Sequence, residues 1–360
     1  MTQLRTVQVL GGGSAGSSAH VRSLAAGLVA RGVRVTVCAP ADIDRAYDFA
    51  GAGAHFAPVP RRSDPAAVGA LRAACAGADV VHAHGLYAAV RAALALAGQR
   101  RRVPLVVTWH TRTHDEGARA AVLRLLERRA VRAAAVVFGT CSELVDRARA
   151  GGARDARLAP AATPTPLTLP AAGHGKLRAE LGVVERPLLM AVGRLEQHRG
   201  YGTLLDAARS WRDLDPAPML MIAGEGPERG TLRRRIADEG LQVRLLGRRD
   251  DVTELLAAAD VAVLPSRWES RSLLAQEALR LGVPLVATAV GGVPELVGEA
   301  AELVPYGDAA ALSSAVTRLL SDPARREWLS EAGRAQAGTW PTEDETVAQV
   351  LSVYDELAVA

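Results

Sequence analysis

Two glutamates eight residues apart lie on either side of an expected helix start. Glu269 falls in the loop after a short buried strand, and Glu277 falls one to two turns into a helix expected at Leu273–Leu281. A serine before that helix, Ser270 or Ser272, can cap its first turn, whose free amides favour an anion such as phosphate. A carboxylate inside the helix can accept hydrogen bonds from paired ribose hydroxyls. The pattern indicates a nucleotide-sugar site, with a solvated loop glutamate and a buried helix carboxylate as the simpler alternatives.

Two arginines follow another expected strand in the same half of the chain. Arg194 comes just after the strand at Leu188–Val192, and Arg199 precedes a helix that begins at Tyr201. Two guanidiniums at the carboxyl end of a strand are suited to holding a diphosphate. Each also fits an ordinary surface arginine, because the chain has 42 arginines and a single lysine.

A glycine loop follows the first apolar segment and precedes a helix. Gly11, Gly13 and Gly16 fit the spacing GxGxxG. A dinucleotide site would also need an acidic residue near the end of the second strand, where Cys38 and Ala39 stand. The loop therefore argues against nicotinamide or flavin and suits a phosphate or the close approach of a substrate, although a tight turn alone explains one or two of its glycines.

Four histidines, His82, His84, His110 and His114, fall near the ends of two expected strands. Zinc sites combine closely spaced ligands, usually with a cysteine or a carboxylate among them, and His110 and His114 fall in an expected loop. We therefore assign no metal. We expect His82 to be a structural histidine with satisfied ring nitrogens, and His84 is a candidate for an acceptor pocket.

Two DxD patterns, at Asp42–Asp44 and Asp213–Asp215, resemble a signature for metal-bound diphosphate. The pattern is short enough to arise by chance among 39 acidic residues. We expect both to be solvated turns.

Short apolar segments alternate with amphipathic ones along the chain. Strand–helix alternation predicts α/β architecture with doubly wound parallel sheets and right-handed crossovers. The expected strands are Thr6–Leu10, Val33–Cys38, Val80–His82, Leu105–Thr108, Ala135–Gly139, Leu188–Val192, Met219–Ala223, Val243–Leu246, Val261–Leu264, Leu285–Ala287 and Glu302–Val304. The expected helices include His20–Ala30, Ala66–Ala76, Arg119–Arg132, Tyr201–Arg209, Thr231–Glu239, Asp251–Ala258, Leu273–Leu281, Ala309–Leu320, Pro323–Ala337 and Glu343–Leu357.

A proline-rich stretch at about residues 158–175 interrupts this alternation. We expect a Rossmann-like domain over residues 1–165 and a second over residues 166–342, with the final helix, within 343–360, packing back on the first domain. Open α/β sheets bind ligands at the carboxyl ends of their strands, so a cleft between the two domains is the expected site.

Several motifs together resemble one enzyme family. They are the glycine loop, VVHAHG at 80–85, VVTWHT at 106–111, VGRLEQHRG at 192–200, IAGEGPERG at 222–230, PSRWESRSLLAQEAL at 265–279, GVPLVATAVGGVPELV at 282–297 and the late Trp340. Across nearly the whole chain they are similar to the family-4 retaining glycosyltransferases (glycosyl transferases group 1). The resemblance implies the GT-B architecture, with two Rossmann-like domains facing across a cleft. The first would bind an acceptor and the second a nucleotide-sugar donor.

The resemblance also implies roles for single residues. Arg194 matches the arginine that meets the donor diphosphate, and Arg199 stands where the family usually has lysine. Glu269 matches the glutamate that addresses the donor sugar, Glu277 the one that binds ribose, and His110 the histidine that points at the reacting centre. Further matches to donor-binding positions are Gly12, Gly13 and Gly16 in the first domain and Ser272, Leu273 and Leu274 in the second.

The chain departs from the family pattern at two places. Ser270-Arg271-Ser272 stands where glycine, phenylalanine and glycine often follow the first glutamate, and LAPAATPTP at 158–166 replaces an asparagine-glycine turn. Loss of the two glycines narrows the space expected for the donor sugar.

Charge is divided unevenly along the chain. Residues 1–157 carry 22 arginines and 11 acidic residues, a net charge of +11, whereas residues 158–360 carry a net charge of −7. The basic half suggests contact with something anionic, such as a phosphorylated acceptor or the head groups of a membrane surface; a solvated arginine-rich face is the alternative. Aromatic side chains do not interleave with the basic runs, which argues against nucleic acid.

The cysteines and the apolar segments bear on location. Cys38, Cys75 and Cys141 are odd in number without CxxC spacing, which fits a reducing cytoplasm. No segment reads as a signal peptide or a spanning helix, so we expect a cytoplasmic protein, with peripheral contact at the inner membrane face left open.

These observations favour a retaining, metal-independent hexosyltransferase. The donor would be a UDP- or GDP-sugar, used as co-substrate with no further cofactor, and the acceptor a hydroxyl group on a lipid, a cell-wall precursor, an inositol phosphate or a secondary metabolite. A sugar-nucleotide epimerase of the same architecture and an inactive nucleotide-sugar-binding subunit are the two alternatives.

Overall fold

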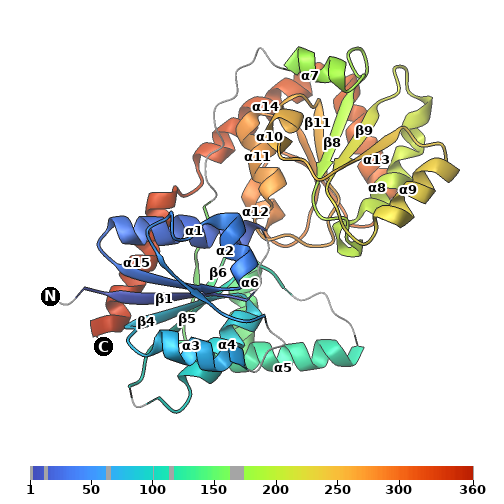
Figure 1. Ribbon diagram of the computed structural model, residues 1–360. Coiled ribbons are helices and arrows are strands. Elements are labelled where there is room, and N and C mark those ends of the chain that lie inside the picture. The colour runs from blue at the N-terminus through green and yellow to red at the C-terminus, as the bar shows by residue number, and fades with distance from the viewer. Residues whose placement is uncertain are drawn as a thin grey trace. The chain divides into compact units, whose positions relative to one another are not determined.

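The computed structural model describes residues 3–11, 15–61, 66–99, 101–112, 117–162 and 174–359. The chain divides into two compact units. Unit 1 comprises Met1–Pro164 and Pro341–Ala360, and unit 2 comprises Thr165–Trp340. Each unit holds a sheet with helices packed on it (Figure 1).

The described part of unit 1 contains a seven-stranded parallel sheet in the order β3-β2-β1-β4-β5-β6-β7. β4 and β5 are buried along their whole length, as strands covered on both faces must be. The strands are β1 (Arg5–Leu10), β2 (Arg34–Ala39), β3 (His55–Pro58), β4 (Val80–His84), β5 (Leu105–Trp109), β6 (Val136–Gly139) and β7 (Ala156–Leu158). The helices are α1 (Ala15–Ala30), α2 (Ala41–Tyr47), α3 (Ala66–Cys75), α4 (Leu86–Leu96), α5 (Gly117–Ala133), α6 (Ser142–Gly151) and α15 (Glu343–Val359).

Unit 2 contains, within the described residues, a six-stranded parallel sheet in the order β10-β9-β8-β11-β12-β13. Its strands are β8 (Leu188–Val192), β9 (Met219–Ala223), β10 (Val243–Gly247), β11 (Val261–Leu264), β12 (Leu285–Thr288) and β13 (Glu302–Val304). Its α-helices are α7 (His174–Glu180), α8 (Tyr201–Ala208), α9 (Arg229–Asp238), α10 (Val252–Ala257), α11 (Leu273–Leu281), α12 (Val293–Val297), α13 (Ala309–Ser321) and α14 (Pro323–Gly338), with short 3-10 turns η2 (Gln197–Arg199) and η3 (Ser210–Asp213). Both sheets confirm the doubly wound α/β prediction.

The final helix belongs to unit 1. Val347, Val350, Val353 and Tyr354 recur at helical spacing on α15 and are all buried in the core that β1, β2 and α1 share. Because Tyr354 reaches the strands from the far end of the chain, α15 contributes a polar atom to the interior of unit 1.

Several elements escaped the sequence analysis for physical reasons. β3 and β7 are edge strands without a fully buried residue, so they lack the apolar runs that mark the central strands. Asp42 and Asp44 were expected in a turn between elements but lie in the first turn of α2. Carboxylates in the first turn of a helix interact favourably with the helix dipole. No helix in the described ranges is long and apolar enough to cross a bilayer.

Candidate functional site

Glu269 and Arg199 form an ion pair at the carboxyl ends of the strands of unit 2. The two residues lie 70 positions apart in the sequence, Glu269 between β11 and α11 and Arg199 at the end of η2. The hydroxyl of Ser266 donates a second hydrogen bond to the Glu269 carboxylate at 2.9 Å. Only 12% of the Glu269 side chain and 28% of the Arg199 side chain are exposed. The structure therefore brings two of the expected site residues into one partly buried, charged cluster.

Backbone contacts hold the Arg199 loop against the strand that leads to Glu269. Gly200 has φ +72°, and a Cβ there would lie 1.9 Å from the carbonyl oxygen of Pro265. The amide of Arg267 donates to the carbonyl of His198 at 2.8 Å. Only glycine permits this close approach, and the approach places Arg199 beside the carboxylate.

A second loop fixes Glu269 from the side of β12. The amide of Gly292 donates to the Glu269 carbonyl at 2.9 Å. Gly291 has φ +55°, and a Cβ there would lie 2.1 Å from that same carbonyl oxygen. The GGVPELV motif therefore acts on the site through its backbone.

The helix α11 begins within this cluster. Ser272 is buried and caps the helix, accepting a hydrogen bond from the amide of Ala275 at 3.4 Å. Leu273 is 39% exposed in the first turn, whereas Leu274 is buried. The expected helix at Leu273–Leu281 is confirmed, and of the two serines that the sequence analysis left open as its cap, Ser270 and Ser272, the second caps it.

Glu277 lies on α11, half-buried, and accepts a hydrogen bond from the hydroxyl of Thr253 on α10. That bond uses one carboxylate oxygen. Among the described residues, the second oxygen of Glu277 has no hydrogen-bond partner. The carboxylate is therefore oriented by its neighbour and still able to accept from a ligand hydroxyl.

Arg194 stands apart from the Arg199–Glu269 pair. Its side chain is 71% exposed, and its Nε donates to Glu196 at 2.7 Å. His198 interacts electrostatically with Glu196, Arg194, Arg199 and Glu269. Burial, followed by the charge of Arg199, lowers the pKa of His198 below its usual value. His198 was missed by the sequence analysis, although it lies in the same GRLEQHRG motif.

Arg271, one of the departures from the family pattern, is directed toward Trp340. Its guanidinium lies 5.7 Å from the centre of the indole ring, and that of Arg280 lies 5.5 Å from it. The indole N–H donates to the carbonyl of Leu296 at 3.0 Å. The departure thus coincides with a cation–π contact to the late tryptophan.

Unit 1 contains a cavity of about 410 Å³ near the ends of β4 and β5. His84 and His110 line it together with Gly11 and Ser17. Its charged lining residues are Arg112, Arg124, Glu127, Arg128 and Arg147. Gly16 lies half-buried in α1, whereas Gly12, Gly13 and His114 fall outside the described residues.

Arginines outnumber acids around this cavity. Arg147 pairs with Glu127 at 2.6 Å, and Arg112 pairs with Glu143 at 2.9 Å. Arg124 and Arg128, one turn apart on α5, are exposed and have no ion-pair partner within the described ranges. The cavity is therefore suited to an anionic group.

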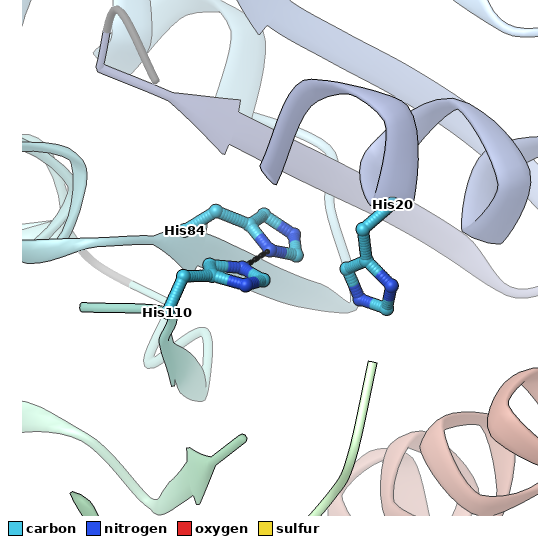
Figure 2. Close-up of side chains that lie close together, drawn as sticks. All are labelled: His20, His84 and His110. Carbon is cyan, nitrogen blue, oxygen red and sulfur yellow. Dashed lines mark hydrogen bonds between the residues drawn. The ribbon is translucent and has the colours of Figure 1, made fainter. Parts of the chain in front are cut away.

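The imidazoles of His84 and His110 lie close to a third, that of His20 (Figure 2). His84 Nδ1 and His110 Nε2 lie 3.2 Å apart. The ring of His20, from α1, lies with its centre 5.3 Å from that of His110 and 5.9 Å from that of His84. Burial lowers the pKa of His20 to about 4 and holds the pKa values of His84 and His110 well below the usual range. All three rings are therefore neutral at pH 7.

A chain of buried polar groups orients His84. Its Nε2 lies 3.0 Å from the side-chain oxygen of Gln8, whose amide nitrogen donates to the Tyr354 hydroxyl at 2.9 Å. Since the Gln8 oxygen can only accept, His84 carries its proton on Nε2 and a lone pair on Nδ1.

This series of hydrogen-bonded side chains ends at His82 and Thr108. The Tyr354 hydroxyl lies 2.6 Å from His82 Nδ1, and His82 Nε2 lies 2.6 Å from the Thr108 hydroxyl. Both ring nitrogens of His82 are satisfied, which confirms its expected structural role. His20 was not singled out from the sequence; its signal is a histidine near the start of the helix that follows the glycine loop.

Comparisons with known proteins cover both units. Residues 175–336 match the model of the family described as glycosyl transferases group 1, and residues 15–162 match that of the glycosyl transferase 4-like domain. The chain is 31% identical over 281 residues to the alpha-D-kanosaminyltransferase of Streptomyces kanamyceticus, a match that covers 71% of this chain and 72% of that enzyme. It is 33% identical to the D-inositol 3-phosphate glycosyltransferase of Thermomonospora curvata, over 72% of this chain and 67% of that one.

Solved structures share the fold. Anabaena HepE in complex with UDP superposes with a TM-score of 0.81 at 19% identity, covering 99% of this chain and 100% of that one. Sucrose-phosphate synthase from Thermosynechococcus elongatus superposes with a TM-score of 0.80 at 23% identity, with the same coverage. With the two parallel-sheet units and both family matches, these findings show that the chain belongs to the glycosyl transferases group 1 and is a family-4 glycosyltransferase of GT-B fold.

Proposed function

We propose that this glycosyltransferase moves a hexose from a UDP- or GDP-sugar to a hydroxyl acceptor, with retention of configuration and without a divalent metal in the transfer step. Donor binding is assigned to residues 166–342, and acceptor binding to residues 1–165 with 343–360. The observation that carries the proposal is the Arg199–Glu269 ion pair beside the capped start of α11. It joins a phosphate-binding cation, a sugar-binding carboxylate and a helix N-terminus in one cluster.

The donor diphosphate competes with Glu269 for the guanidinium of Arg199. When Arg199 turns to the diphosphate, the Glu269 carboxylate becomes available to accept hydrogen bonds from the sugar hydroxyls, with Ser266 holding its orientation. Arg194, exposed and paired with Glu196, supplies a second cation. Together with the amides of Ser272, Leu273 and Leu274, these charges stabilise the negative charge that develops on the departing nucleoside diphosphate.

Glu277 holds the nucleoside. Its free carboxylate oxygen accepts hydrogen bonds from the ribose hydroxyls, while Thr253 fixes the other oxygen. In unit 1, the resemblance to the family assigns contact with the donor to His110, Gly12, Gly13 and Gly16. In this scheme the acceptor attacks the face from which the diphosphate departs, and a phosphate oxygen takes the acceptor proton.

The acceptor carries an anionic group. The cavity of unit 1 offers Arg124 and Arg128 beside His84 and His110, and a relative named above acts on D-inositol 3-phosphate. A soluble phosphate ester and an anionic lipid head group present the same chemistry to these arginines. Val122 and Leu125, more than half exposed on the same helix, favour the lipid.

A donor and acceptor screen tests the proposal. The protein is incubated with UDP- and GDP-sugars in EDTA, with inositol phosphate in one arm and vesicles rich in anionic lipid in another. Release of nucleoside diphosphate with an acceptor product of retained anomeric configuration supports it. A changed sugar without an acceptor product would identify an epimerase, and binding without turnover an inactive nucleotide-sugar-binding subunit.

A further inference from the structure

Three histidines of unit 1 come together from three different elements. His20 lies on α1, His84 ends β4 and His110 follows β5. Their closest ring nitrogens all lie within 4.8 Å of one another, and Figure 2 shows the three rings gathered in one place. We propose that these three histidines form a binding site for a divalent transition metal, with Zn²⁺ as the ion that fits best. His20 and His84 lie 64 residues apart in the sequence, and His84 and His110 lie 26 apart, so the three do not form a recognisable sequence motif.

The spacing of two nitrogens already suits a metal. Zinc–imidazole bonds of 2.0–2.1 Å in a tetrahedral site place two ligand nitrogens about 3.3 Å apart. The observed separation of His84 Nδ1 and His110 Nε2 is 3.2 Å. His20 lies further out, with its ring nitrogen within 4.8 Å of the other two, and must move closer to complete the site.

Two of the rings, those of His84 and His20, are oriented by hydrogen bonds of the kind that orient metal-binding histidines. Histidines that bind metals usually donate their other N–H to a carbonyl or a carboxylate, which fixes the ring and its tautomer. His84 donates from Nε2 to the Gln8 oxygen and directs its Nδ1 lone pair into the cluster. His20 is hydrogen-bonded to the backbone of Ala162.

The ligand set selects the class of metal. Three imidazoles without a carboxylate suit Zn²⁺, Ni²⁺ or Cu²⁺, whereas Mg²⁺ and Ca²⁺ require oxygen ligands. Three protein ligands leave a fourth tetrahedral position for water. The cavity that His84 and His110 line supplies both that position and a path of entry.

This site is separate from the Arg199–Glu269 cluster, because its ligands belong to unit 1 and that cluster belongs to unit 2. One ligand, His110, is also a residue of the proposed transfer, but the binding measured below requires no turnover. Zinc binding is therefore expected whether or not the chain transfers a hexose, and the two proposals can fail separately.

Titration of the untagged, chelator-treated full chain with Zn²⁺ in a calorimeter tests the site. We expect one equivalent to bind, and His20→Ala to weaken that binding by about tenfold or more. His55→Ala, at an exposed histidine outside the cluster, should bind like the wild type. Co²⁺ should give the intense visible absorption of four-coordinate cobalt in the wild type and lose it in His20→Ala.

Circular dichroism establishes that each variant is folded. Should His20→Ala not fold, His20→Gln, which keeps a polar side chain without an imidazole, replaces it under the same criteria. Equal zinc affinity in the wild type and the His20 variant, or no stoichiometric binding by the wild type, would overturn the proposal.

Discussion

The guanidinium of Arg199 meets the carboxylate of Glu269 across 70 residues of sequence, at the carboxyl ends of β8 and β11. Neither β8 nor β11 brings the pair together alone. The backbone of Gly200 must touch Pro265, and the backbone of Gly292 must reach Glu269. The charged pair is thus a product of close loop packing over a parallel sheet.

Removal of the Arg199 charge should lower turnover. Arg199→Ala is expected to reduce kcat by about 100-fold or more, because the cation is needed most when the diphosphate departs. Arg199→Lys should retain more activity, since a point charge remains in place. Steady-state assays with a saturating donor measure both. Arg209→Ala, which removes a cation paired with Glu239 in the same unit, is the control and should leave kcat unchanged.

Loss of the Glu277 carboxylate should act on donor binding. Glu277→Ala is expected to raise the KM for the donor by about tenfold or more, because a charged hydrogen-bond acceptor is lost. Thr253→Val keeps the carboxylate and removes only the hydroxyl that orients it, so its effect should be smaller. A larger effect of Thr253→Val than of Glu277→Ala would contradict the ribose-binding role.

A Cβ at Gly200 should destabilise the fold around the site. Gly200→Ala adds an atom 1.9 Å from the Pro265 carbonyl oxygen, and we expect a loss of about 3 kcal/mol or more in the free energy of unfolding. Gly182, with φ +69° and open space around it, provides the matched control. Gly182→Ala should lower the free energy of unfolding by only about 1 kcal/mol, the cost of the strained backbone. Urea denaturation compares the two, and equal losses would refute the close-approach argument.

The buried histidines should make stability depend on pH. Burial lowers the pKa of His20 to about 4 and that of His82 to about 3, whereas both titrate near 6.5 in the unfolded chain. Below pH 6.5 the unfolded chain therefore binds more protons, and stability falls as the pH is lowered. From pH 7 to 5.5 each histidine contributes a loss of about 1 kcal/mol.

Urea denaturation of the chelator-treated protein at pH 7 and at pH 5.5 measures this loss of stability. His20→Gln should reduce the difference between the two pH values by about 1 kcal/mol, and His55→Ala should leave it as in the wild type. A stability that rises from pH 7 to pH 5.5 would have the wrong sign for buried neutral histidines.

The sequence was most informative where chemistry and local structure share one segment. The buried strand β11, the loop with Glu269 and the cap at Ser272 follow one another within 12 residues from Val261, so periodicity and capping rules located them. β1, β4 and β5 were found because parallel strands covered on both faces are continuously apolar.

Long-range contacts were beyond such rules. Gln8 and Tyr354 are bonded across 346 residues, and His20 joins His84 and His110 only in the folded unit, where α1 packs on β1 and β2. Propensities and motifs describe neighbours in sequence, whereas these partners are set by the packing of the whole unit. A local contact was also missed: the position of Arg194 after β8 was expected, but its ion pair with Glu196 was not.

Acceptor-dependent release of nucleoside diphosphate, measured side by side for the wild type and Glu269→Gln, tests the central claim most directly. Glutamine keeps the shape of the side chain and removes the charge that pairs with Arg199. The account predicts turnover by the wild type, with a product of retained anomeric configuration, and a rate about 100-fold or more lower for the variant. Equal rates for the two proteins, or an inverted product, would contradict it.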